Sequence, residues 1–453
     1  MIRLFWIPAL VLVVGCRTDR ADLVWGVADP VHSFAAVRAP SGEVAPTGRT
    51  TFASGPDRLE LDTLWELVLA NNPALREAEA DVEVARGRLV QAGLYPNPRV
   101  LYEQSVIGSR AARQGNGLLQ VNQEIVTGGK RELDQAVAER ETSAAAVAMV
   151  GRKFEVLTQL RRAYYDYRAF RAQFDVSEQS VRSLEGGVEV TRRQVETAKT
   201  RPQTDLVRLE ALLEEAKIGR ARAEELGRAA WRQVVALVGV SDLPQPAPTT
   251  PADDRPPEWD EAVVLHRVIE ANTAIKQAAV EAERARLAVE RATAEQVPNV
   301  TVGAGYVSEN VDRTAGPLLS IELPLPVWDR RQGAIHEARA RQARAQAAIR
   351  SAETRLRHDT AEALGRYQAA RVQVDRLTRD VLPRLTKSLE LLRSALAAGS
   401  GQVTFGDVLM TEQNLNATRL TLTEAKRSLW LAVADLEGLM QLDVGETLTR
   451  PAR

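Results

Sequence analysis

An internal repeat with a spacing of 202 residues constrains this fold more than any other feature of the sequence. The stretches at 121–136 and 321–338 share one order of features: an alternating apolar run, a turn and a helix-forming run. Pairs at this spacing are Val121 and Leu323, Ile125 and Val327, Ala136 and Ala338, Pro96 and Pro298, and Asn97 and Asn299. The chain is therefore predicted to be a tandem duplication of a unit that contains a helix, two strands and a long helix.

Each copy is predicted to carry two strands. In the last of these, Ile321, Leu323 and Leu325 fall on one face, while Glu322 and Pro324 fall on the other. The four expected strands lie at about 99–106, 117–127, 299–307 and 317–327. A strand of about ten residues can cross a bilayer core when it is tilted, although a soluble hairpin shows the same alternation.

Long helices are predicted to follow the strands. Residues 130–185 contain one glycine and no proline, which corresponds to a helix of about 80 Å. The second copy predicts a longer helix over 334–398, with Pro383 as a kink. Turns near 199–202 and 399–401 would return the chain through helices at 204–237 and 405–439. Such helices pack as thin antiparallel coiled coils rather than around a thick core.

These elements give a linear domain plan. Residues 1–15 have a basic start and a short apolar run, as in a secretory signal peptide. The remaining predicted segments are an N-terminal linker at 16–58, the first repeat at 59–243, a proline-rich linker at 244–258, the second repeat at 259–443 and a tail at 444–453.

The single cysteine lies directly after the apolar run. Val13-Val14-Gly15-Cys16 resembles the bacterial lipobox, in which the cysteine is lipidated and becomes the new N-terminus. Arg17 follows it, in place of Asp, and in this respect the chain resembles lipoproteins that are sorted to the outer rather than the inner membrane. The alternative is an ordinary signal peptide with an incidental cysteine.

Composition excludes several functions. The net charge of −1 gives no reason to expect nucleic-acid binding. The four histidines are scattered, and His336 and His358 lie 22 residues apart, so no metal site and no cofactor are predicted. No nucleophile–base pair or phosphate-binding loop is recognisable, and an enzyme is not expected.

The strands themselves predict assembly. A sheet in lipid cannot leave an open edge, and closed barrels begin at about eight strands, so four strands require identical neighbours. The competing interpretation is a periplasmic scaffold lipoprotein of coiled coils, with short hairpins as caps and no pore. Matching strand phase across the duplication (Val100 with Val302, Val121 with Leu323) favours a shared lipid face.

Several sequence motifs are similar to those of one protein family. Ala70-Asn-Asn-Pro73, Pro96-Asn97-Pro98 and Thr127-Gly-Gly-Lys-Arg131 are similar to segments of TolC-like outer-membrane efflux proteins. Pro326-Val-Trp-Asp-Arg-Arg-Gln-Gly333 is similar to the helix-opening motif of the branch serving cobalt–zinc–cadmium and copper efflux. The resemblance covers about 60 to 443.

The resemblance implies a fold and partners. It implies a mainly α homotrimer in the outer membrane of a Gram-negative-type bacterium, with a twelve-stranded β-barrel continuous with a periplasmic α-helical barrel. It also implies docking onto a periplasmic adaptor and an inner-membrane pump of the resistance-nodulation-division type. The chain would be a passive exit duct, with heavy-metal cations as one candidate cargo; an exit duct for a secreted polypeptide is the alternative within the family.

The resemblance also points to the periplasmic helix tips. The family motif of Gly followed six places on by Asp-Val-Leu occurs as Gly401 and Asp407, with Thr404 between them, and as Lys199 and Asp205 with lysine in place of glycine. Rings of these aspartates could narrow the entrance. The alternative is that they cap the N-termini of the returning helices.

Strand–helix junctions form the remaining candidate set. Gly128, Gly129 and Gly333 are expected to permit the bend from strand to helix. The other junction residues are Pro96, Asn97, Pro98, Pro298, Asn299, Trp328 and Asp329.

Overall fold

The computed structural model describes residues 60–105, 116–199, 201–240, 243–245, 255–309, 314–398 and 403–445. The expected signal peptide, Cys16, most of the proline-rich linker and Gly401 lie outside these ranges.

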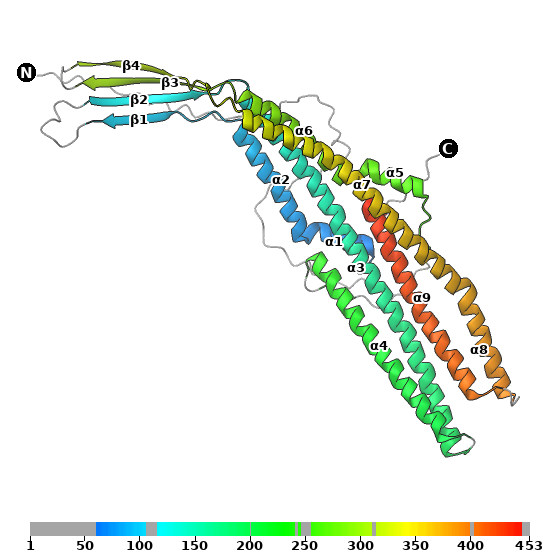
Figure 1. The fold of residues 1–453 in the computed structure, drawn as a ribbon. Coiled ribbons are helices and arrows are strands. Elements are labelled where there is room, and N and C mark those ends of the chain that lie inside the picture. The colour runs from blue at the N-terminus through cyan, green and yellow to red at the C-terminus, as the bar shows by residue number, and fades with distance from the viewer. Residues whose placement is uncertain are drawn as a thin grey trace, which may run out of the picture. The chain divides into compact units, whose positions relative to one another are not determined.

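Two copies of one series of elements follow each other along the chain (Figure 1). The first contains α1 (Leu61–Asn71), α2 (Pro73–Ala92), β1 (Arg99–Gln104), β2 (Asn116–Ile125), α3 (Lys130–Glu196) and α4 (Gln203–Val238). The second contains α5 (Glu261–Ala271), α6 (Thr273–Ala294), β3 (Val300–Glu309), β4 (Thr314–Glu322), α7 (Gln332–Arg376), the π-helical turn η2 (Leu377–Val381), α8 (Leu382–Ala397) and α9 (Phe405–Met440). The predicted duplication is confirmed.

The four strands form one antiparallel sheet in the order β1-β2-β3-β4, so the repeats meet where β2 pairs with β3 (Figure 1). The predicted strand bounds need correction at several ends. β2 ends at Ile125 rather than 127, and β3 continues to Glu309. β4 begins at Thr314 and ends at Glu322, before the predicted 327, because Glu322 pairs with Thr301 at the start of β3 and prolines follow.

The predicted phase match of the strands holds, and the register adds a detail to it. Val100 pairs with Val121, whereas its repeat partner Val302 pairs with Ile321 and not with Leu323. The second hairpin is therefore two residues out of step with the spacing of 202. Because side chains alternate with a period of two, this offset leaves the same residues on the same face.

Long helices pair beside one another as predicted, but two of their details differ. α3 continues past Glu185, through Gly186 and Gly187, to Glu196. The helix of the second repeat contains the π turn η2, which ends two residues before Pro383, the predicted position of the kink. Pro383 lies in the first turn of α8, where its missing N–H is tolerated, so the break falls just before it.

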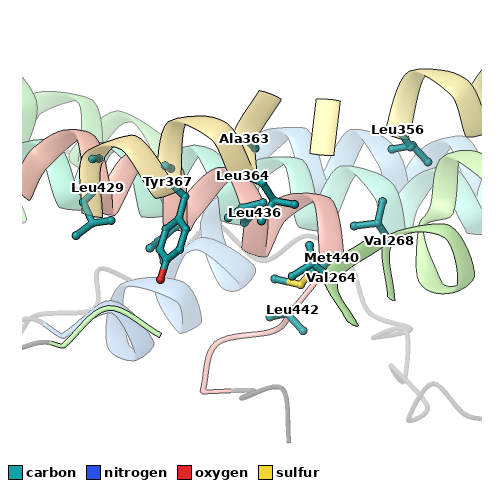
Figure 2. Close-up of a cluster of buried hydrophobic side chains, with 13 residues drawn as sticks. Val264, Val268, Leu356, Ala363, Leu364, Tyr367, Leu429, Leu436, Met440 and Leu442 are labelled. Atoms are coloured by element: carbon teal, nitrogen blue, oxygen red, sulfur yellow. The ribbon is translucent and has the colours of Figure 1, made fainter. Parts of the chain in front are cut away.

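The core is thin and divided into clusters. One cluster packs α5, α7 and α9 together, and Figure 2 shows Val264 of α5, Tyr367 of α7 and Met440 of α9 within it. A second cluster lies between α3 and α4, and Leu409 of α9 contributes to it. Leu409 thus joins the two helical hairpins.

A buried asparagine repeats at the break between the two short helices of each copy. Asn72 accepts a hydrogen bond from the N–H of Ala74 at 2.9 Å and donates to the carbonyl of Leu237 at 2.7 Å. Asn272 accepts from Ala274 and donates to the carbonyl of Leu439 with the same chemistry. Each asparagine starts one helix and satisfies the last turn of another.

Within the described ranges, none of the helices combines the length and the apolar character needed to cross a bilayer.

Candidate functional site

One face of the sheet is apolar and exposed. Its most exposed large apolar residues, between 48 and 72% exposed, are Val100, Tyr102, Leu119, Val121, Ile125, Tyr306, Leu319 and Ile321. A contiguous apolar surface of this kind is uncommon on a protein surrounded by water and is typical of a lipid- or protein-facing surface. The predicted alternation therefore produces a sheet with one apolar side.

The other face is more polar and carries an excess of carboxylates, although it also includes Leu101, Leu118, Val307 and Leu318. Register places Glu103, Glu124, Glu309 and Glu322 on this face, and Arg99 is the one basic residue that the described strands place there. Gln120 lies between them and donates to Asn122 Oδ1 at 2.7 Å and to the hydroxyl of Ser320. This face has the composition of a surface that contacts water and cations.

Two glycines make room for this polar network. A Cβ added at Gly303 would lie 2.0 Å from Gln120 Nε2, and one added at Gly305 would lie 2.4 Å from the carbonyl oxygen of Leu119. Gly316 on β4 shares the face but has open space around it. Glycine is therefore required at 305 by the close approach of the β2 backbone, whereas at 303 the close atoms are the ends of polar side chains.

The junction between β2 and α3 is held by a hydrogen-bonded latch, defined here as Asn299, Lys130, Thr127 and Glu124. Asn299 Oδ1 accepts from Lys130 Nζ at 2.6 Å and from the N–H of Thr127 at 3.3 Å. Asn299 Nδ2 donates to Glu124 Oε1 at 2.7 Å. Lys130 is only 2% exposed, so the latch, and not solvent, satisfies its ammonium group.

The predicted glycine bend occurs at Gly128 and Gly129, whose φ angles are +69° and +67°. In the second repeat the prediction for Gly333 is wrong. Gly333 lies inside α7, and the left-handed position is taken by Arg331 with φ +60°, 202 residues after Gly129. Asp329 Oδ1 accepts from the N–H of Arg331 at 2.9 Å, which stabilises a conformation that arginine rarely adopts.

Other predicted junction residues lie at the same boundary. The carbonyl of Pro96 accepts from Gln123 Nε2 at 2.9 Å, and the carbonyl of Pro298 accepts from the hydroxyl of Thr127 at 2.6 Å. Pro98 directly precedes β1 and is exposed. Trp328 is 89% exposed, an arrangement common for aromatic residues at a membrane–water interface.

The two helix tips differ. Thr404 and Asp407 form a capping box at the start of α9, and hydrogen bonds from Thr404 lower the pKa of the Asp407 carboxyl. At the other tip Lys199 has φ +50°, the conformation that a glycine would favour, and α4 starts at Pro202 without a side-chain cap. Asp407 thus caps its helix, whereas Asp205 does not.

A buried ion pair joins α3 to the end of α9, and the sequence did not reveal it. Arg161 Nε lies 3.0 Å from Glu437 Oε2, and the Arg161 side chain is 4% exposed. The guanidinium also donates to the carbonyls of Leu442 and Asp443 at 3.0 and 3.1 Å. Burial raises the pKa of Glu437, while Arg161 opposes that rise.

A metal centre is not evident at these positions. The described residues contain no group of three or more His, Cys, Asp and Glu side chains arranged to hold a metal ion.

The fold is thus a duplicated unit of long helices and a strand hairpin, and the two hairpins form one sheet with unlike faces. The family model described as outer membrane efflux protein matches residues 64–240 and 264–440, one match for each repeat. The chain therefore belongs to the outer membrane efflux protein family, and the predicted function of an outer-membrane efflux channel is confirmed.

Relatives share this architecture at low identity. The cobalt-zinc-cadmium resistance protein CzcC of Cupriavidus metallidurans is 22% identical over 374 residues, which cover 81% of this chain and 86% of CzcC. CusC, which forms a transmembrane channel, superposes with a TM-score of 0.70 at 19% identity over 84% of this chain and 91% of CusC. The MtrE outer membrane channel of Neisseria gonorrhoeae in its open state gives 0.68 at 19% identity over 84% and 88%.

Proposed function

We propose that this chain is the outer-membrane exit duct of a tripartite efflux system and acts as a homotrimer. The observation that carries the proposal is the sheet, which has one exposed apolar face, one carboxylate-bearing face and two unpaired edges. Three copies would supply about twelve strands, within the range of known closed barrels. The apolar face would contact outer-membrane lipid and the polar face would line the water-filled bore.

The partners supply energy and control. An inner-membrane pump of the resistance-nodulation-division type would deliver solute, and a periplasmic adaptor would join the pump to this channel. The helix tips, with Lys199, Asp205, Gly401, Thr404 and Asp407, are the proposed adaptor contact and aperture. Capping of α9 by Asp407 does not prevent the same carboxylate from lining the entrance.

Divalent heavy-metal cations are the substrates that we propose. The excess of carboxylates on the polar face favours cations by charge, and CzcC is a cobalt-zinc-cadmium resistance protein. Passage through the duct requires no binding site for a resident metal. The sheet gives no observation that favours a polypeptide as the cargo.

Metal sensitivity tests the substrate. Deleting this gene should sensitise the bacterium to Co²⁺, Zn²⁺ and Cd²⁺, and restoring the chain should reverse the effect. Unchanged sensitivity to all three ions, with the adaptor and the pump expressed, would reject metal efflux.

Ion selectivity in planar bilayers tests the proposed bore. Replacing Glu103, Glu309 and Glu322 together with glutamine should reduce the preference for cations over anions, because these carboxylates would face the conducting path. The control is Glu83→Gln on α2, where Glu83 is paired with Arg86 at 2.5 Å. Equal selectivity in the wild type and the triple variant would exclude this face from the bore.

A lipid anchor at Cys16 is a separate part of the proposal. Cys16→Ala should leave the chain folded but weaken its retention in the outer membrane, because one of its two attachments is lost. The same fractionation before and after the substitution would remove the anchor and leave the channel proposal intact.

A further inference from the structure

The latch at the β2–β3 seam implies a second, unfinished latch elsewhere on the chain. Asn97 precedes β1 as Asn299 precedes β3, in the same Pro-Asn pair and at the repeat spacing. Asn299 makes three hydrogen bonds across the seam. Asn97 is exposed, and no described residue hydrogen-bonds its side chain.

The partners that Asn97 lacks are also repeated. Asp329 and Gln332 lie 202 residues after Thr127 and Lys130, and both are exposed at the start of α7. α7 begins after a left-handed residue, Arg331, as α3 begins after Gly129, so the backbone frame for this half of the latch is present.

The two halves lie at opposite edges of the sheet. Asn97 adjoins β1 and the pair Asp329 and Gln332 follows β4, and these strands are the two edges. Exposed edges can pair only with another chain. The β2–β3 seam shows what such pairing brings together: the asparagine before one strand and the residues after the other.

We infer that Asn97 of one copy completes the latch with Gln332 and Asp329 of the next copy. Gln332 Nε2 already donates to the carbonyl of Trp328 at 3.3 Å, and its second hydrogen supplies the donor that Lys130 supplies within the chain. The Asp329 carboxylate supplies an acceptor for Asn97 Nδ2. The inference rests on the proposed homotrimer and adds to it a specific side-chain contact at each subunit boundary.

The chemistry of the two seams is not equal. The counterpart of Lys130 is an uncharged glutamine, and the counterpart of Glu124 is Pro326, which has no acceptor side chain. Charged hydrogen bonds are stronger than neutral ones. The latch between copies is therefore predicted to be the weaker of the two latches.

Disulfide trapping in outer membranes tests the contact on the full-length chain. The variant with Asn97→Cys and Gln332→Cys should give, after mild oxidation, covalent dimers and trimers that reducing agent returns to monomers. Each single variant should stay monomeric, which also controls for bridges through Cys16. The double variant Lys130→Cys and Asn299→Cys should form a disulfide within one chain and give no covalent dimers or trimers.

The outcomes separate the latch from the trimer. Monomers from the double variant, with trimers still captured by an amine-reactive cross-linker, would overturn the latch alone. Monomers under both treatments would overturn the trimer as well. If the double variant fails to reach the membrane, a photo-crosslinking residue at position 97 should attach to the tryptic peptide 332–339 of another copy, and attachment elsewhere would contradict the inference.

Discussion

The carboxylate of Asp407 accepts hydrogen bonds from the N–H of Thr404 at 2.8 Å and from its hydroxyl at 2.6 Å. The N–H of Asp407 in turn contacts the Thr404 hydroxyl oxygen at 3.3 Å. This reciprocal pair fixes the first turn of α9 at the helix tip. Asp205 holds the equivalent position in α4, where the preceding cap residue is a proline.

This difference predicts unequal effects of two matched substitutions. Asp407→Ala should increase hydrogen exchange at the amides of 405–408, because the first turn of α9 loses its cap. Asp205→Ala should leave exchange at 203–206 unchanged. Equal effects at the two tips would show that the capping box does not stabilise α9.

The same pair predicts a pH dependence. The folded-state pKa of Asp407 lies below its ordinary value of 3.8, so the ionised form is favoured in the folded protein. Its stabilising contribution is therefore complete above that value and is lost as the pH falls through the folded-state pKa. Fraying of α9 followed by NMR should begin only below about pH 4, and fraying that begins near neutral pH would contradict this assignment.

The buried pair Arg161 and Glu437 predicts a large loss of stability. Arg161→Met should lower the free energy of unfolding by about 3 to 5 kcal/mol, because it removes a buried charge partner and two hydrogen bonds to carbonyls. Glu437→Gln should cost less, because Arg161 keeps its hydrogen bonds to the carbonyls of Leu442 and Asp443. Thermal unfolding followed by circular dichroism measures both.

Arg162→Ala is the control for that comparison. Arg162 contacts Asp435 at 3.4 Å, but its side chain is 52% exposed, so little stability depends on it. If Arg162→Ala lowered the free energy of unfolding as much as Arg161→Met, burial would not explain why one ion pair stabilises the fold more than the other.

Close packing in the sheet predicts a further pair of outcomes. Gly305→Ala places a methyl group against the backbone of β2 and should cost about 1 to 3 kcal/mol. Gly316→Ala, on the same face of β4, meets open space and should be neutral. The yield of heat-resistant oligomers on gels compares them, and equal yields would refute the packing argument.

The two faces of β4 predict the last contrast. Leu319→Lys puts a charge on the apolar face and should reduce insertion into lipid by about 2 to 4 kcal/mol if it lies near the bilayer centre. Leu318→Lys, one residue earlier, points to the polar face and should insert normally. Assembly into liposomes measures this difference, and equal insertion of both variants would show that the apolar face does not contact lipid.

Much of the fold could be predicted because alternation and repetition are local signals. The alternation of apolar and polar residues around Val121 and Leu319 predicts which face of the sheet they occupy, and Gly128-Gly129 predicts a turn. The register could not be predicted, since an offset of two residues leaves the alternation unchanged, and Ile321 and Leu323 are equivalent candidates.

The candidate site was harder to predict where it depends on distant contacts. Nothing in the sequence distinguishes Arg161 from the many other arginines on these helices until packing brings Glu437 to it. The latch joins Lys130 to Asn299 across 169 residues. Arg331 was missed because the nearby Gly333 is the residue type expected at a left-handed position.

The molar mass of the purified mature protein in detergent, measured by light scattering, tests the central claim most directly. A four-stranded sheet with one apolar face and two open edges predicts a stable assembly of three chains. A folded monomer, with its helices and strands intact by circular dichroism, would contradict the account.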